Sequence, residues 1–170
     1  MGISHKAYAF DWEPFEKRVR PLLEAALSSH NPEALLALIE RQLGAFADPY
    51  EGAPLEQGWR ARLERGDEHE VGDYALTLCY RPTEDFGVGD QWLEMESVLS
   101  DGAKKALLGR PIGPPDNLFD PGKMGSYFQS PEQCRASLSI IESECDKVPA
   151  EFLDGLRQTR RLDKGLYVTF

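Results

Sequence analysis

The three histidines are the first candidates for chemistry, because an imidazole changes charge near neutral pH and also binds metals. His5, His30 and His69 are far apart in the chain, and no two have the i, i+4 spacing that places a pair of imidazoles on one metal. We therefore expect no metal site. His69 stands between Glu68 and Glu70, which suits either an acid or base role or, more simply, a solvated histidine at the start of a helix.

Other catalytic patterns are missing from the sequence. There is no Gly-x-Ser-x-Gly motif, and the run Gly87-Val88-Gly89-Asp90 is too short for a phosphate loop and lacks a lysine. The acidic pairs Glu94/Glu96 and Glu142/Glu144 are spaced i, i+2, so on a helix their carboxylates point to different sides. We expect no cofactor, and these observations favour a non-enzymatic protein without deciding the matter.

A segment rich in glycine and proline, residues 109–131, separates the helix-rich first part of the chain from the last helices. Its apolar residues, which include Ile112, Phe119 and Phe128, predict an ordered and packed loop rather than a solvated linker. A cation on such a loop suits a carboxylate or phosphate ligand, or else it binds backbone carbonyls and fixes the loop. The ligand alternative predicts a pocket beneath the loop with four polar groups: Arg110, Asp116, Tyr127 and His69.

The net charge of −10 arises in a single stretch of the chain. Residues 46–101 contain 14 Asp and Glu against 4 Arg and no Lys, whereas the rest of the chain is neutral. Phosphate binding needs the opposite sign, so the charge argues against nucleic acid as a partner and suits a basic protein surface. A solvated acidic face with no partner is the simpler alternative.

The residues that we expect at a protein interface combine these acids with two aromatic side chains, because buried aromatic residues dominate interface energies. They are Tyr50, Glu51, Asp67, Glu68, Glu70, Asp73, Glu84, Asp85, Phe86 and Asp90. Trp59 and Trp92 lie in the same stretch, and core packing is the favoured interpretation of both.

A chain of 170 residues is long enough to form one domain around one core. No apolar run reaches the roughly 18 residues of a membrane span, and the first residues lack the basic and apolar regions of a signal peptide. We expect a cytoplasmic protein without a membrane partner, and its oligomeric state is unknown at this stage. Cys134 and Cys145, eleven positions apart, should share a helix face and pack in the core as reduced thiols.

Periodicity and end signals place the regular elements along the chain. Alternating apolar residues predict strands at 3–10 and 166–170. Helical spacing and capping residues predict helices over residues 12–27, 32–43, 59–65, 68–80, 91–99, 104–108, 131–146 and 150–158. Pro21 should interrupt the first helix, and a strand is the alternative for residues 71–80.

The first and last segments are the clearest strands, so we expect them to pair with each other in a small sheet that helices cover. This arrangement is an α+β fold. The sequence thus predicts a helix-dominated single domain, residues 1–170, whose small sheet includes the N- and C-terminal strands.

Several pieces of the chain resemble a known group of sequences. They are Tyr8-Ala9-Phe10-Asp11, the run Leu107-Leu108-Gly109-Arg110-Pro111-Ile112-Gly113, and Gly125-Ser126-Tyr127-Phe128 followed by a capped helix at Ser130-Pro131-Glu132. Together they look like the YfbM-like proteins and related actinobacterial domains. The resemblance implies a bacterial source and a compact α+β domain, and it carries over no catalytic residue. The acidic stretch 46–101 departs from that group.

These observations together favour a non-enzymatic protein-binding module, of the immunity or inhibitor type, that presents the acidic stretch 46–101 to a basic partner. The alternative is a small-molecule-binding domain or enzyme with a pocket under residues 109–131.

Overall fold

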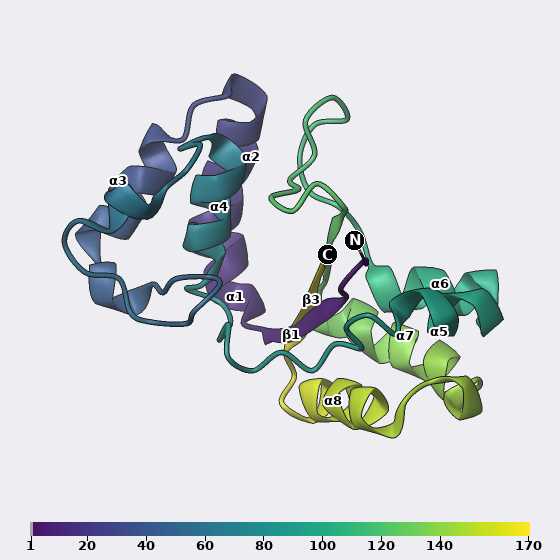
Figure 1. The fold of residues 1–170 in the computed structure, drawn as a ribbon. Helices are drawn as coiled ribbons and strands as arrows, with labels where there is room; N and C mark the ends of the chain where they lie inside the picture. Colours follow the sequence, from purple (N-terminus) through teal and green to yellow (C-terminus); the bar gives the residue numbers. More distant parts are fainter. Residues whose placement is uncertain (1) are drawn as a thin grey trace. The chain divides into compact units, whose positions relative to one another are not determined.

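A computed structural model describes residues 2–170, and the chain forms two compact units (Figure 1). The first unit comprises the chain up to Trp12 together with Asp85–Pro111 and Gly122–Phe170. The second unit comprises Glu13–Glu84 and Ile112–Pro121. The organisation of the whole chain as a single domain stays a prediction.

The first unit is built on a three-stranded antiparallel sheet in the order β1-β3-β2. β1 (Lys6–Phe10) and β2 (Ser126–Gln129) both pair with the central β3 (Gly165–Thr169), so that Tyr167 is opposite Tyr8 on one side and Phe128 on the other. The predicted pairing of the N- and C-terminal strands is confirmed, and so is the helix-dominated α+β fold.

β2 lies inside residues 109–131, which the sequence predicts as a loop throughout. Its four residues are too few to show a strand period, and Gly125 and Pro131 stand close to its ends. The strand forms because its backbone pairs with β3 on one side, while Arg110 and Phe128 exchange backbone hydrogen bonds of 3.0 and 2.8 Å on the other. The strand conformation of β2 is therefore set by pairing with distant segments rather than by its local sequence pattern.

The outer edge of β1 is covered by a loop rather than by another strand. The N–H of Ala7 donates to Asp85 Oδ1 (3.0 Å), and its carbonyl accepts from the N–H of Phe86 (2.9 Å). Gly87 is needed for this approach, because a Cβ at that position would stand 2.3 Å from the carbonyl oxygen of His5. Covering the edge in this way removes a template for pairing with other chains.

The helices of the first unit are α5 (Trp92–Val98), α6 (Asp101–Leu108), α7 (Pro131–Glu142) and α8 (Ala150–Arg161), with a 3₁₀ turn at Cys145–Lys147. Their apolar faces join Ala7, Leu166 and Val168 of the sheet in one core cluster. Ser130 and Gln133 form the predicted capping box at the start of α7.

The two cysteines expected on one helix face have different environments. α7 ends at Glu142, earlier than predicted, so Cys145 lies beyond the helix and is exposed. Cys134 is buried as expected, and this burial raises the pKa of its thiol to about 12. The prediction of a shared buried face was therefore wrong for Cys145.

The second unit begins with one continuous helical run (Figure 1). α1 (Trp12–Pro14) starts at the boundary of the first unit and leads through a π-helical turn (Phe15–Val19) into α2 (Arg20–Ser29). Pro21 lies in the first turn of α2, where its missing N–H is tolerated. The predicted restart of the helix fits this arrangement, because α-helical geometry begins again at Arg20, immediately before Pro21, after the π-helical turn.

α3 (Glu33–Arg41) follows, then 3₁₀ turns at Leu43–Ala45 and Trp59–Arg62 and the buried helix α4 (Glu68–Leu76). Residues 71–80 are thus helical to Leu76 and then turn, so the strand alternative was wrong. Gly72 fits close packing, since a Cβ there would stand 2.8 Å from Leu23 of α2 and 2.9 Å from Phe119. Within residues 2–170, no helix is both long enough and apolar enough to span a membrane.

Candidate functional site

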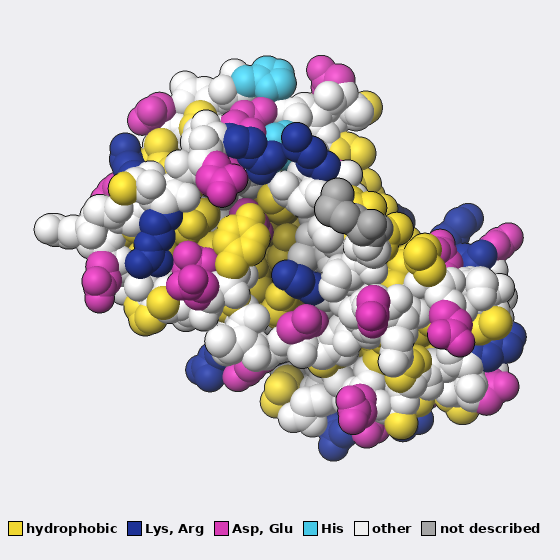
Figure 2. Space-filling view, viewed as in Figure 1, with side chains coloured by type: hydrophobic (Ala, Val, Ile, Leu, Met, Phe, Trp, Pro, Cys, Tyr) yellow, Lys and Arg dark blue, Asp and Glu magenta, His cyan; other side chains and the backbone are white. Residues whose placement is uncertain are grey.

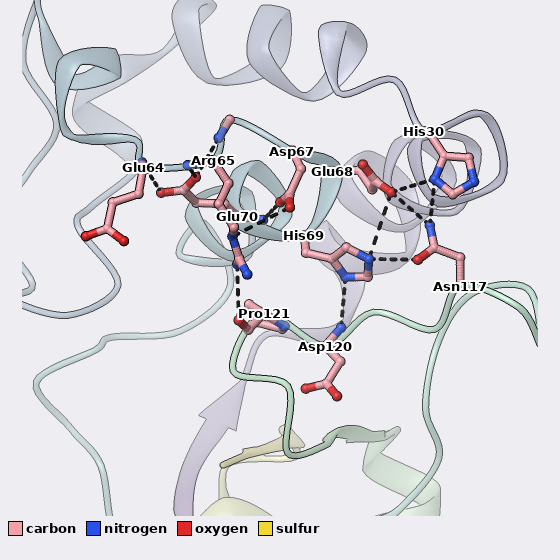
Figure 3. Close-up of polar contacts among 11 residues, drawn as sticks. His30, Glu64, Arg65, Asp67, Glu68, His69, Glu70, Asn117, Asp120 and Pro121 are labelled. Carbon is pink, nitrogen blue, oxygen red and sulfur yellow. Dashed lines mark hydrogen bonds and ion pairs between the residues drawn. The ribbon is translucent and has the colours of Figure 1, made fainter.

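The N-terminus of α4 is the centre of a polar network in the second unit (Figure 3). Asp67 is the N-cap, and its Oδ1 accepts from the N–H of Glu70 at 2.9 Å, which confirms the predicted cap. The carboxylate of Glu70 accepts three backbone N–H groups, from Glu64, Arg65 and Gly66, each at 2.7 Å. Glu70 therefore acts as an internal anion that fixes the loop entering α4.

Glu68 links this helix to two other segments of the unit. Its Oε1 lies 2.9 Å from His30 Nδ1 and accepts from Asn117 Nδ2, also at 2.9 Å. Burial pushes the pKa of the Glu68 carboxyl upward, but hydrogen bonds from its own backbone N–H, Asn117 and His30 outweigh burial and hold this pKa below its ordinary value. Glu68 is thus ionised at neutral pH and holds its partners as a charged acceptor.

His69 is held in one tautomer by its neighbours. Asn117 Nδ2 faces two acceptors, Glu68 Oε1 and the carbonyl oxygen of Leu27 at 2.8 Å, so the amide oxygen of Asn117 must face the other way. That oxygen lies 2.8 Å from His69 Nε2, which therefore carries the proton, while His69 Nδ1 accepts the N–H of Asp120 at 3.1 Å. The side chain of His69 is 18% exposed, so the predicted solvated histidine was wrong.

Three acids that we expected to face a partner are buried in this unit instead. Glu68, Glu70 and Asp73 are 7%, 8% and 8% exposed. Buried carboxylates need internal donors, and Glu68 and Glu70 use theirs to join segments of the same unit. This corrects the expectation that all the acids of residues 46–101 belong to a surface. Asp67 is half-buried and serves as a helix cap.

Other expected interface residues of the second unit are exposed. Tyr50 is 70% exposed, and Glu51 and Glu84 are exposed as well. The turn that carries Tyr50 and Glu51 is fixed by Asp48, whose Oδ1 accepts both of their backbone N–H groups. On the face drawn in Figure 2, acidic side chains alternate with Lys and Arg rather than gathering in one area.

Three expected interface residues belong to the first unit. Asp85 is exposed, but its Oδ1 is used by the N–H groups of Ala7 and Gly87, so it supports the loop along β1. Phe86 is half-buried and packs edge to face on Phe152, which makes it part of the core margin. Asp90 is exposed.

Helix α5 in the first unit combines exposed apolar side chains with unpaired acids. Trp92 and Met95 are 4% and 5% exposed and face the core, whereas Leu93 and Val98 are each 53% exposed. Residues 85–101 contain five acids and neither Lys nor Arg. We define the α5 face as the exposed residues Asp90, Leu93, Glu94, Val98 and Asp101.

The acids of the α5 face are open to an external partner. Among the described residues, neither Asp90 nor Glu94 has an ion-pair partner, and Asp101 has only a long 3.8 Å contact with Lys104 while its side chain is 95% exposed. Two exposed apolar side chains beside free carboxylates form a surface that suits a basic partner with an apolar contact.

The four residues of the alternative pocket are divided between the units. Arg110 and Tyr127 belong to the first, and Asp116 and His69 belong to the second. Arg110 and Asp116 are exposed, and the backbone rather than the side chain of Arg110 fixes the loop, through Phe128. His69 binds Asn117 and Asp120, as described above, and Asp116 takes no part in that network.

Two cavities are lined by other residues. A groove of about 230 Å³ in the second unit lies along Ala53–Trp59 and Arg62. A cavity of about 10 Å³ in the first unit, the size of one water molecule, lies beside Gln129, Ser137 and Thr159. Neither is lined by a residue of the predicted pocket.

Metal ligands do not gather in the part of the chain that the structure describes, where no group of three His, Cys, Asp or Glu side chains is placed to hold an ion. The remaining histidine, His5, is fully buried and stacks on Trp92 with ring centres 4.7 Å apart. Its Nδ1 accepts the N–H of Val88 at 3.1 Å, and burial lowers its pKa to about 4 despite the opposing charge of Asp85.

Comparisons with known proteins add no relative: no family model, no curated protein and no solved structure matches this chain. The resemblance to YfbM-like proteins therefore stays a prediction.

The sequence analysis did not identify the exposed apolar residues of α5 or two residues of the polar network at α4. Leu93 and Val98 lie off the buried stripe of α5, and their positions on the helix could have revealed them as exposed. His30 and Asn117 gave no local signal, because their shared partner Glu68 is 38 and 49 positions away.

Proposed function

We propose that the protein is a non-enzymatic protein-binding module that takes a basic partner on the α5 face. The observation that carries this proposal is the exposure of Leu93 and Val98, each 53%, on a short helix near Asp90 and Glu94, for which the described residues form no ion pair. Apolar side chains supply the contact area, and the surrounding charge speeds association and excludes acidic partners.

The proposed partner-binding surface is thus limited to residues 90–101 of the acidic stretch 46–101. Near α4, Glu68 and Glu70 accept hydrogen bonds from their own unit, whereas the carboxylates of the α5 face are exposed and can bind a partner. An inhibitor or immunity-type role, in which such a surface blocks a basic protein, is one form of the proposed function.

Site-specific photo-crosslinking tests the proposal. A photoreactive side chain replaces Leu93 in one variant and Ile140 in another, because Ile140 is 45% exposed on α7 of the same unit but lies outside the α5 face. Cells of the source organism, or their lysate, then supply the partner.

We expect a basic protein to be captured at position 93 and not at position 140. Capture should weaken at high salt, since exposed charges are screened over about 10 Å at 0.1 M salt. The substitution Glu94→Lys should also weaken it. No product at position 93, or equal products at both positions, would contradict the proposal.

A further inference from the structure

The segment Ile112–Pro121 is a distinct piece of the second unit, because the residues on both sides of it, up to Pro111 and from Gly122, belong to the first unit. We call this segment the strap. Its apolar anchors are Ile112 and Phe119, which are 5% and 0% exposed.

Polar contacts hold the strap to the rest of its unit as well (Figure 3). Asn117 reaches Leu27, Glu68 and His69, the N–H of Asp120 donates to His69 Nδ1, and Arg65 Nη2 donates to the carbonyl oxygen of Pro121 at 3.2 Å. We call the contacts of His69 with Asn117 and Asp120 the clasp. In the clasp, a side chain that can change its charge, His69, forms hydrogen bonds with two residues of the strap.

We propose that His69 makes the strap proton-sensitive: the clasp is closed when the imidazole is neutral and opens when it is protonated. A neutral ring with its proton on Nε2 satisfies both contacts, as a donor to Asn117 and an acceptor from Asp120. A second proton on Nδ1 places two donors opposite each other, so the Asp120 contact is lost.

Several groups around His69 influence its protonation and the contacts of the protonated ring. Glu68 Oε1, 3.9 Å from His69 Nε2, attracts a charged ring, and Glu68 in turn contacts His30 at the end of α2. The ring of Phe119, which belongs to the strap, stacks on His69 with ring centres 6.3 Å apart. The carboxylate of Asp120 points away from the ring in Figure 3, and Arg65 donates to the carbonyl oxygen of the adjacent Pro121.

The expected opening is local. The buried side chains of Ile112 and Phe119 keep the strap attached, while the backbone around Asp120 is released.

Amide hydrogen exchange of the intact protein tests the proposal, with each rate divided by the rate of an unstructured chain at the same pH. We expect the protection of the Asp120 amide to fall about tenfold between about pH 8 and about pH 5.5, the effect of losing one hydrogen bond and leaving its donors unsatisfied. Amides within α3 should keep their protection, because α3 makes no contact in the clasp.

Two variants distinguish the clasp from general acid effects. His69→Asn keeps an oxygen acceptor for Asp120 but cannot take a proton in this range, so its protection at Asp120 should not depend on pH. His30→Gln removes the other nearby imidazole and should leave the pH response in place. His5 should not interfere, because its pKa of about 4 keeps it neutral at about pH 5.5.

A direct measurement covers the case in which the variants fold poorly. The ¹⁵N chemical shifts of His69 in the wild-type protein should show the tautomer protonated on Nε2 while the ring is neutral, and the Asp120 amide should lose protection together with the appearance of the doubly protonated ring. Unchanged Asp120 protection while His69 takes up its second proton would overturn the proposal, as would a loss of protection while the ring stays neutral.

Discussion

The α5 face and the N-terminus of α4 are both rich in acids, yet the two regions use their carboxylates in opposite ways. At α4, Glu68 and Glu70 are buried and accept hydrogen bonds from the same unit. At α5, Glu94 is exposed and the described residues offer it no cation. A local excess of acids in a sequence therefore measures charge, and the geometry decides whether that charge is structural or available to a partner.

The largest effect should come from the internal anion at α4. Glu70→Ala removes an acceptor from three backbone N–H groups and leaves them poorly satisfied, so the free energy of unfolding should fall by about 3 kcal/mol. Urea unfolding measures this value. Glu94→Ala is the matched control, and it should change stability by less than about 0.5 kcal/mol. If the two variants lost similar amounts of unfolding free energy, the carboxylates of the two regions would not differ in their structural role.

The next effect concerns His5, a buried polar side chain in the same unit as the α5 face. Its folded pKa of about 4 lies below the ordinary histidine pKa of 6.5, so the unfolded chain binds the extra proton first as the pH falls. The contribution of His5 to stability is therefore present above about pH 6.5 and declines toward pH 4, by about 3 kcal/mol in all.

Urea unfolding at several pH values separates this contribution from those of the carboxylates. The slope of stability against pH between about pH 4 and 6.5 should be smaller in His5→Phe than in the wild type, whatever the absolute stability of the variant. An NMR titration of His5 that gave an ordinary histidine pKa would contradict the prediction.

A smaller effect is expected at the cap of α4. Asp67→Ala removes the acceptor of the Glu70 N–H and should lower the free energy of unfolding by about 1 kcal/mol. Asp67→Ser keeps a capping oxygen and should recover most of the loss in the same urea experiment. If serine fails to do so, the ion pair of Asp67 with Arg65, at 3.5 Å, contributes more than the cap.

The smallest effect should be that of Leu93→Ala on the α5 face. Leu93 is 53% exposed, so the substitution should change the free energy of unfolding by less than about 0.5 kcal/mol while weakening partner binding. Met95→Ala on the same helix removes a buried side chain and should lower stability by about 2 kcal/mol. Equal losses would show that Leu93 is a core residue in solution.

Local signals predicted the parts of the fold that depend on neighbouring residues. The capping box of α7 joins Ser130 and Gln133, three positions apart, and the restart of the helix next to Pro21 fits its one missing N–H. The alternation at both ends of the chain predicted β1 and β3, and a sheet was the simplest way to satisfy two amphipathic strands.

Contacts over long distances in sequence were not predictable in the same way. Asn117 donates to the carbonyl oxygen of Leu27, 90 positions away, and nothing in either neighbourhood indicates the pair. β2 depends on β3 for its backbone partners, so its own four residues carried too little information. Glu68 and Glu70 resemble any acids in the first turn of a helix, and only the surrounding loop and strap bury them.

The central position of β3 has a consequence for the folding rate. Among residues 2–170, β1 and β2 both form their strand ladders with β3, and Phe10 and Gly165 are about 155 positions apart in the chain. Such a pairing closes a very long loop before it gains any stabilising contact, which slows folding more than it lowers stability. In a refolding experiment the helices should therefore acquire protection from hydrogen exchange before the sheet does.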